Sequence, residues 1–206
     1  MSIKEKAKSA REVFEGDKSL NKTYTSIRSL HDEPEAKVAF DGARQRMMDV
    51  NSWGGIPGPE NAEFQLYDSQ GPKSDAPEVG DFIKTMLPGP FPENWVQIID
   101  IQEDPDRVSF SVRPCQGPDK TPRSVAQTKH FFKSSASSTF ILQRKGNVLK
   151  ASEVGFNESI NNQGPEAGNR KVLNTIISEA GWALVQKLQW ENVTDYIVGK
   201  KHSRDD

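Results

Sequence analysis

Hydrophobic residues recur with helical spacing near the carboxyl end of the chain, between about residues 169 and 190. At about 100° per residue they fall on one third of the helical wheel, as in a helix that buries one face. The stripe consists of Leu173, Ile176, Ile177, Ala180, Leu184 and Leu188. A helix of about 22 residues spans roughly 33 Å, enough to cross several strands. The pattern therefore predicts a long helix that lies on a sheet.

Two more helices are predicted nearer the amino end. A short one occupies the first residues and ends near Gly16; its apolar face consists of Ile3, Ala7, Ala10 and Phe14. A second helix is capped by Asp32, carries Pro34 in its first turn and stops at Gly54-Gly55. Its apolar face consists of Ala36, Phe40, Ala43, Met47 and Val50. Residues 23–27, between the two helices, fit either a short first strand or a linker.

From residue 56 onward the hydrophobic period becomes that of strands, and clusters of Gly and Pro separate the segments. The candidates lie around Phe64 and Leu66, at 82–87, 95–101, 108–112, around Phe140 and Leu142, and at 148–156. Lys145-Gly146-Asn147 reads as a hairpin turn, which would make the last two strands antiparallel neighbours. The order of a helix, about five to seven strands and a helix predicts an α+β domain with an antiparallel sheet.

Particular residues in this order resemble the START-like or polyketide-cyclase-like superfamily, also called SRPBCC. They are Trp53 at the end of a helix, Gly80-Asp81-Phe82 and the segment 95–100 in the sheet, the hairpin from Phe140 to Phe156, and Gly181-Trp182 and Leu188 ahead of Tyr196-Ile197. The resemblance covers roughly residues 30–198 and implies the helix-grip fold, in which a bent antiparallel sheet wraps a long C-terminal helix. We expect an N-terminal helix and polar linker at 1–30, one domain at 31–198 and a charged tail at 199–206.

Family members use the cavity between sheet and helix for lipids, hormones or polyketides, and some branches contact a chaperone. The resemblance thus implies non-enzymatic binding of a small hydrophobic or lipid-like ligand, since such cavities are mostly apolar. Aromatic residues of the predicted strands are the candidate lining: Phe82, Trp95, Phe110, Phe140 and Phe156. The alternative, favoured for any single aromatic, is that it fills the core. A cyclase, dehydratase or hydrolase using the same cavity and a chaperone-contacting interaction module are the other functional readings.

Two residues are weak candidates for acid–base catalysis. His130 is the one histidine inside the predicted sheet region, although no partner residue is fixed by spacing. Glu153 shares a strand face with Leu149 and Ala151, and it would enter the cavity if that face were concave. Because the other face carries Val154 and Phe156, a solvated Glu153 on the convex side is the favoured alternative. Cys115 has no neighbouring base in the sequence and is expected to be unreactive.

The composition of the chain limits the classes of partner and cofactor that we expect it to bind. The 206 residues suit one domain, and 27 basic against 29 acidic residues give a net charge of −2, which disfavours nucleic acid. No apolar run reaches the roughly 18 residues of a membrane span, and the polar start and single cysteine fit a cytoplasmic protein. The three histidines stand far apart and the glycine segments lack phosphate-binding spacing, so no metal and no cofactor are expected. The expected partner is a small apolar ligand, and a homodimer is also considered.

Trp182 lies about 180° from Leu173 on the helical wheel, among polar residues. Gly181 beside it costs about 1 kcal/mol in a helix interior relative to Ala, which suggests that another segment approaches closely. We expect the N-terminal helix to cover Trp182; the favoured alternative is a Trp half buried by nearby loops.

Overall fold

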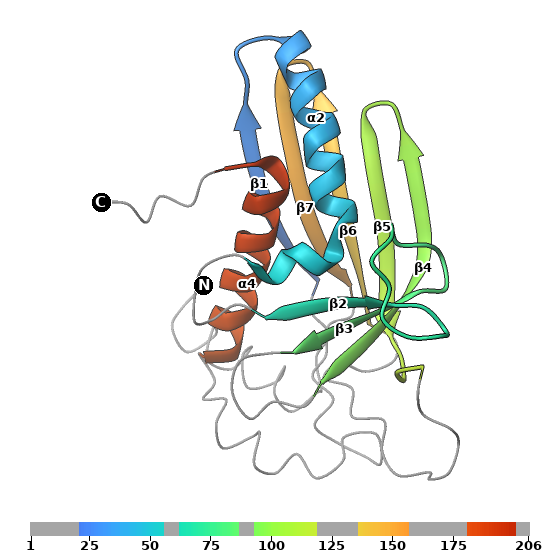
Figure 1. Ribbon diagram of the computed structural model, residues 1–206. Helices are drawn as coiled ribbons and strands as arrows, with labels where there is room; N and C mark the ends of the chain where they lie inside the picture. Colours follow the sequence, from blue (N-terminus) through green and yellow to red (C-terminus); the bar gives the residue numbers. More distant parts are fainter. Residues whose placement is uncertain (1–20, 56–61, 87–92, 119–135, 157–180, 201–206) are drawn as a thin grey trace, which may run out of the picture.

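The computed structural model describes residues 21–55, 62–86, 93–118, 136–156 and 181–200, with backbone alone for residues 55 and 181–188. Two α-helices, one 3-10 helix and seven strands lie in these ranges (Figure 1). In chain order they are β1 (Lys22–Ser29), α2 (Glu33–Met48), η1 (Val50–Gly55), β2 (Glu63–Tyr67), β3 (Phe82–Met86), β4 (Asn94–Asp104), β5 (Arg107–Pro114), β6 (Ser137–Lys145), β7 (Val148–Phe156) and α4 (Gly181–Val198).

All seven strands form one sheet in the order β1-β7-β6-β5-β4-β3-β2, and every neighbouring pair is antiparallel. The first strand therefore lies beside the last, with Tyr24 opposite Glu153. Figure 1 shows β2 and β3 running across the direction of the other strands, so the sheet is strongly bent. Both α-helices lie on the same face, where α4 packs on β1 and β7 and α2 packs on β6 and β7. The prediction of a helix-grip α+β fold is confirmed.

Helix α2 begins where its sequence predicts, but it ends at Met48, and the 3-10 helix η1 occupies the residues up to the predicted stop at Gly54-Gly55. The Asp32 carboxylate accepts a hydrogen bond from the backbone N–H of Glu35 at 2.8 Å, which satisfies one of the free donors at the helix start. Pro34 occupies the first turn, where its missing N–H costs nothing. One face of the helix is buried against the sheet, through Ala36, Phe40, Ala43 and Met47. The apolar stripe read from the sequence is the buried stripe of the structure.

The hairpin between β6 and β7 is also confirmed. Lys145 pairs with Val148, and the turn between them contains Gly146 with φ of +58°. Glycine adopts this left-handed conformation without the steric cost that a side chain would bring. The turn sets the register that aligns Phe140 with Glu153.

Three expectations need correction or lie outside the described residues. Residues 23–27 are a strand and not a linker, so the sheet domain includes β1 and does not begin at residue 31. The closing helix does not end near Trp190; α4 continues to Val198. Its described buried residues come after the predicted stripe in the sequence and, at about 100° per residue, most of them lie on a different side of the helix: Gln189, Val193, Thr194, Ile197 and Val198. The first helix, the stripe from Leu173 to Leu188 and the cover on Trp182 fall outside the residues whose side chains are described.

Candidate functional site

An aromatic layer occupies the inner face of the sheet, the face on which the helices pack. Trp53 of η1 lies at its centre, with ring centroids 5.6 Å from Phe64, 5.8 Å from Phe110 and 4.8 Å from Phe140. The indole N–H of Trp53 donates to the backbone carbonyl of Arg46 at 3.0 Å. Because this donor is satisfied and the ring is 1% exposed, Trp53 is a fixed wall of the layer.

Helix α4 adds a second indole to the layer. The Trp190 ring lies 5.5 Å from Phe140 and 6.2 Å from Phe64. Its Nε1 atom is buried and has no hydrogen-bond partner among the described residues. A buried indole N–H normally finds an acceptor, since leaving its hydrogen bond unmade costs about 1 to 3 kcal/mol. Trp190 therefore offers a donor beneath α4.

Glu153 lies on the same inner face and is 0% exposed. Side chains alternate along β7, so Glu153 lies on the side of Leu149 and Ala151, which belong to the core. Its cross-strand neighbours are Tyr24 on β1 and Phe140 on β6. Glu153 and Trp190 thus approach Phe140 from the sheet and from the helix respectively.

The expectation that Glu153 is solvated on the convex face was wrong. It rested on the apolar residues of the opposite face, but Phe156 on that face is 53% exposed and Val154 is partly exposed. The helices cover the face with the smaller side chains Ala151 and Gly155, because small residues leave room for close packing. A carboxyl group in such a layer costs free energy unless it is protonated or paired.

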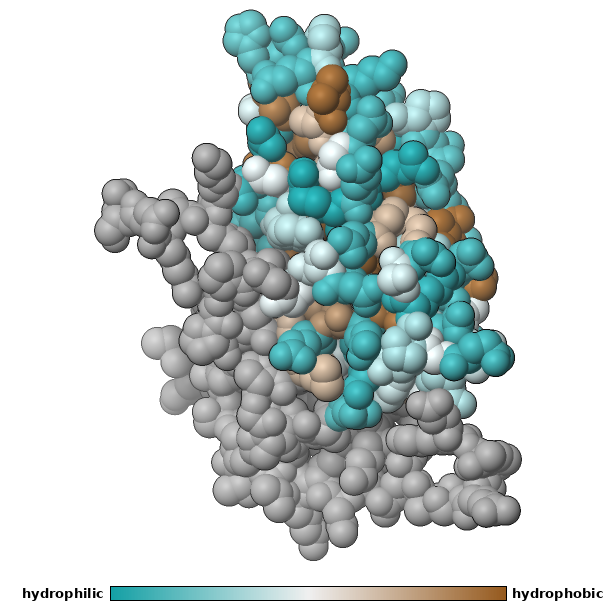
Figure 2. Space-filling model, viewed as in Figure 1, coloured by the Kyte–Doolittle hydropathy of each residue, from teal (hydrophilic) through white to brown (hydrophobic). Residues whose placement is uncertain are grey.

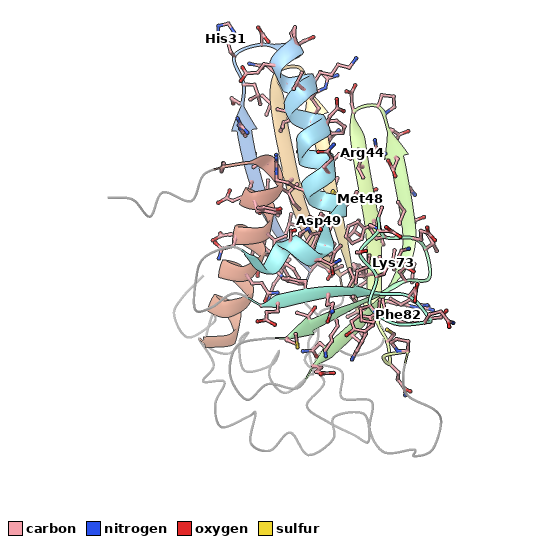
Figure 3. All side chains as sticks on the ribbon, in the orientation of Figure 1. His31, Arg44, Met48, Asp49, Lys73 and Phe82 are labelled. Atoms are coloured by element: carbon pink, nitrogen blue, oxygen red, sulfur yellow. The ribbon has the colours of Figure 1, made fainter. Side chains whose placement is uncertain are left out.

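The five predicted lining aromatics divide between the two faces. Phe110 and Phe140 are on the inner face, 0% and 3% exposed, and their rings pack 5.1 Å apart within the core. Phe82, Trp95 and Phe156 lie on the outer face, so their placement in a cavity under the helix was wrong. Their neighbours along each strand, such as Ile83 and Val96, take the inner positions. In Figure 3, Phe82 lies at the start of β3, away from α4 in this view.

Trp95 forms its own cluster on the outer face. Its ring is 4.9 Å from Tyr67 and 5.8 Å from the Lys84 ammonium, and it is 9% exposed. A Cβ added to Gly117 would meet the Trp95 ring at 2.7 Å, so the chain after β5 lies directly on the indole. Burial raises the pKa of the neighbouring Cys115 thiol to about 12, with Arg113 acting in the opposite direction. The thiol is therefore scarcely ionised at neutral pH, in line with the unreactive cysteine expected.

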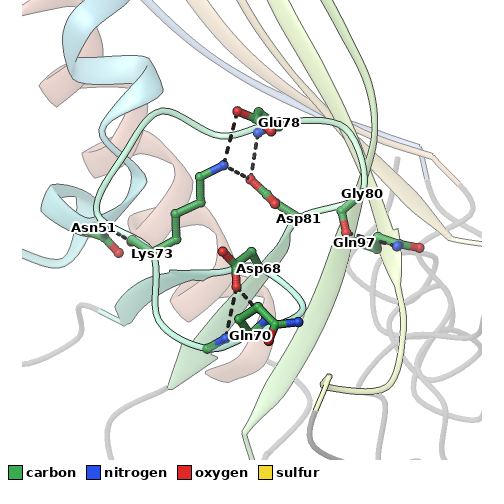
Figure 4. Close-up of polar contacts among 9 residues, drawn as sticks. Asn51, Asp68, Gln70, Lys73, Glu78, Gly80, Asp81 and Gln97 are labelled. Carbon is green, nitrogen blue, oxygen red and sulfur yellow. Dashed lines mark hydrogen bonds and ion pairs between the residues drawn. The ribbon is translucent and has the colours of Figure 1, made fainter.

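A charged network fixes the loop between β2 and β3 (Figure 4). The Lys73 ammonium lies 2.8 Å from an oxygen of Asp81 and 3.6 Å from one of Glu78. The same Asp81 oxygen accepts the backbone N–H of Glu78 at 2.8 Å. Asn51 donates to the Lys73 carbonyl and joins the loop to η1. Each charge has a partner within the network, so this cluster is structural.

The remaining candidates are placed as follows. His130 lies outside the described residues. Among the described residues, no three His, Cys, Asp or Glu side chains are grouped as metal ligands would be. Neither described α-helix combines the length and apolar character needed to cross a bilayer.

The large apolar side chains exposed in the described ranges belong to several different elements: Ile27, Val38, Val79, Ile99 and Phe156. Figure 2 shows a face on which hydrophilic residues dominate and hydrophobic ones are scattered. Isolated exposed apolar residues are common on protein surfaces and do not by themselves mark an interface.

No protein-family description matches the sequence, and no curated protein matches it either. Solved structures do resemble it. Hypothetical protein jhp0584 from Helicobacter pylori has a TM-score of 0.51 at 8% identity, over 90% of this chain and 92% of that one. Major latex-like protein 151 from Panax ginseng has a TM-score of 0.43 at 13% identity, over 86% and 97%. Norcoclaurine synthase from Thalictrum flavum has a TM-score of 0.38 at 12% identity, over 91% and 92%.

At these identities the likeness concerns the fold alone. The helix-grip fold that the sequence resemblance implied is confirmed by the strand order and by the placement of the helices.

Proposed function

We propose that this protein binds a small, largely apolar ligand between the inner face of its sheet and α4. The observation that carries the proposal is the buried N–H of Trp190, which has no acceptor among the described residues. An apolar ligand with a carbonyl or hydroxyl oxygen would supply that acceptor. The surrounding rings of Phe64 and Phe140 would contact the rest of the ligand.

Glu153 supports the same proposal from the sheet side. It is the one carboxylate side chain among the described residues that is 0% exposed, and it lies beside Phe140. A few polar groups in an apolar surrounding are the usual composition of a small-molecule site, because they fix the orientation of the ligand. With Trp190 as donor and Glu153 as acceptor, the ligand would be held at both faces of the layer.

The experiment uses the ketone dye prodan as a probe, because it joins an apolar ring system to a carbonyl acceptor. We expect its emission to shift to the blue on binding. Trp190→Phe, which keeps an aromatic ring but removes the N–H, should weaken binding about two- to tenfold, the effect of one hydrogen bond. Trp95→Phe is the matched control, since that indole lies on the outer face. Absence of binding, or equal weakening by both variants, would contradict the proposal.

Acid–base catalysis by Glu153 is the second candidate, and its inward position favours it. A carboxyl group held in an apolar layer is suited to proton transfer, the step that cyclases, dehydratases and hydrolases share. Hydrolysis of p-nitrophenyl butyrate is a first assay. Turnover above that of buffer should fall about 100-fold in Glu153→Gln and persist in the exposed control Glu33→Gln. Equal rates in both variants would exclude Glu153 from this reaction.

A further inference from the structure

Two arginines from different elements meet at the C-terminal end of α4. Arg28 of β1 donates through Nη1 to the carbonyls of Val198 and Gly199, both at 3.2 Å. Arg46 of α2 donates through Nε to the carbonyl of Ile197 at 3.0 Å. These bonds satisfy helix carbonyls that have no partner within the helix.

Gly199 shows how close the two guanidinium groups are. A Cβ added to this residue would lie 2.8 Å from Nη1 of Arg28 and 2.9 Å from Nη2 of Arg46. Both nitrogens are therefore near one point, and they lie less than about 6 Å apart. The φ of Gly199 is +72°, so glycine suits the backbone as well as the space.

Neither arginine has an ion-pair partner among the described residues, although other cations of the chain do. Arg44, two residues before Arg46 on α2, pairs with Glu103, and Arg144 pairs with Asp106. The carbonyls at a helix end carry only about half a negative charge, which does not balance two guanidinium ions. Burial lowers the pKa of Arg46; the next largest effect, from Tyr196, raises it, and the charge of Arg28 lowers it further. Positive charge is in local excess here.

Donors also remain after the helix carbonyls are satisfied. A guanidinium group has five N–H donors in a planar fork. In the described part of the chain, Arg28 uses Nη1 and Arg46 uses Nε, which leaves Nη2 of both residues for another acceptor. Planar forks of this kind bind carboxylate and phosphate oxygens through paired hydrogen bonds.

We propose that Arg28 and Arg46 form a binding site for an oxyanion, a phosphate or carboxylate group, beside Gly199. An anion there would accept hydrogen bonds from Nη2 of each arginine, the donors that remain after the helix carbonyls are satisfied. An anion bound there holds β1, α2 and the end of α4 together, because each of the three elements contributes to the site. This site is separate from the aromatic layer proposed to bind an apolar ligand.

The oxyanion has two sources, which one experiment distinguishes. It is either a free anion or a carboxylate of Asp205 or Asp206, because the six residues after Lys200 can span up to about 20 Å. Inorganic phosphate is titrated calorimetrically into the full chain at constant ionic strength. A second titration uses a variant carrying Asp205→Asn and Asp206→Asn.

For a free anion we expect saturable phosphate binding to the unaltered chain, weakened about tenfold or more by Arg28→Gln and by Arg46→Gln. Arg44→Gln is the matched control on the same helix and should bind phosphate normally. For an internal carboxylate, binding should emerge only in the doubly substituted tail. Where a glutamine variant does not fold, Arg28→Lys compared with Arg44→Lys decides by the same criterion.

Two results would overturn the proposal. One is no phosphate binding by either the unaltered chain or the tail variant. The other is binding that Arg28→Gln, Arg46→Gln and Arg44→Gln weaken to the same extent, since general positive charge would then explain it.

Discussion

Ser26 of β1 and Thr194 of α4 share a buried hydrogen bond, with their side-chain oxygens 2.8 Å apart. The Thr194 hydroxyl also contacts the carbonyls of Trp190 at 2.9 Å and Glu191 at 3.1 Å. A carbonyl cannot donate, so the single Thr194 proton serves the helix and Ser26 donates to Thr194. Together with the Arg28 bonds at the end of α4, this bond joins the first strand to the last helix.

A double-mutant cycle should detect this bond. We expect Ser26→Ala and Thr194→Val each to lower the free energy of unfolding by about 1 to 2 kcal/mol, because each leaves a buried hydroxyl without its partner. The double variant should lose less than the sum, with a coupling of about 0.5 to 1.5 kcal/mol. Urea denaturation measures all four proteins, and strictly additive losses would show that the bond contributes nothing.

Asp81→Asn should destabilise the loop between β2 and β3. It removes the closest partner of the Lys73 ammonium, whose side chain is 11% exposed. Breaking a buried pair from one side costs about 3 kcal/mol, and thermal denaturation measures the loss. Glu78→Gln is the matched control. Its side chain is 78% exposed and 3.6 Å from the ammonium, so about 0.5 kcal/mol or less is expected.

The same pair gives a pH dependence. Asp81, through its hydrogen bond, raises the pKa of Lys73 above its ordinary value of 10.5. A raised pKa means that the folded state holds this proton more tightly, so the stabilisation is complete below pH 10.5 and is lost as pH rises through the folded-state value. The stability difference between the unaltered chain and Asp81→Asn should therefore shrink above pH 10.5 and stay constant between pH 7 and 9. A difference that shrinks between pH 7 and 9 would contradict this assignment.

Substitution by alanine should change the free energy of unfolding in opposite directions at Gly42 and at Gly54. Gly42 lies inside α2, where an added Cβ makes an ordinary contact at 3.5 Å, so Gly42→Ala should stabilise by about 0.5 to 1 kcal/mol. At Gly54 the Cβ would meet the backbone oxygen of Ala62 at 2.9 Å, so Gly54→Ala should destabilise by about 1 to 3 kcal/mol. Chemical denaturation of both variants tests the pair, and a shift of the same sign in both would refute it.

Cys115 should resist alkylation. With the pKa of its thiol near 12 instead of 9.0, the thiolate is roughly a thousandfold rarer at pH 8 than in the unfolded chain. Iodoacetamide at pH 8 should label the folded protein slower than the urea-unfolded protein by about that factor or more. Gly117→Ala should speed the labelling, because it displaces the chain that lies on Trp95 beside the thiol. Equal rates for folded and unfolded protein would show an accessible thiolate.

The strands from β2 onward and the start of α2 could be predicted because their signals are local. The alternation of Val108, Phe110 and Val112 indicates which residues of β5 share a face. Asp32 and Pro34 indicate where α2 begins. These features depend on neighbours a few residues apart. The sequence therefore sufficed for the elements and, through the resemblance, for the fold.

The candidate site depends on contacts between residues that are far apart in the sequence, and some of the predictions about it were right and others wrong. Alternation placed Glu153 with Ala151, but only the position of the helices determines which face of β7 is covered. An aromatic residue is favoured in a core and also on an outer face under a loop, as Trp95 is, so residue type did not separate it from Phe140. Nothing near Trp190 in the sequence marked it as a site residue. Whether its N–H finds an acceptor depends on residues far along the chain.

The position of β1 beside β7 also governs how the chain reaches its native state. Ser26 and Thr194 are 168 residues apart in sequence, and the nearer partners of β1 lie on the seventh strand. During synthesis the first strand must therefore wait without its strand neighbour in the sheet until β7 has emerged. Pairings of such wide separation fold slowly because the closure entropy is lost before the contacts form. We expect a nascent chain halted before residue 148 to remain sensitive to protease at β1, and the sheet to close only when its last strand arrives.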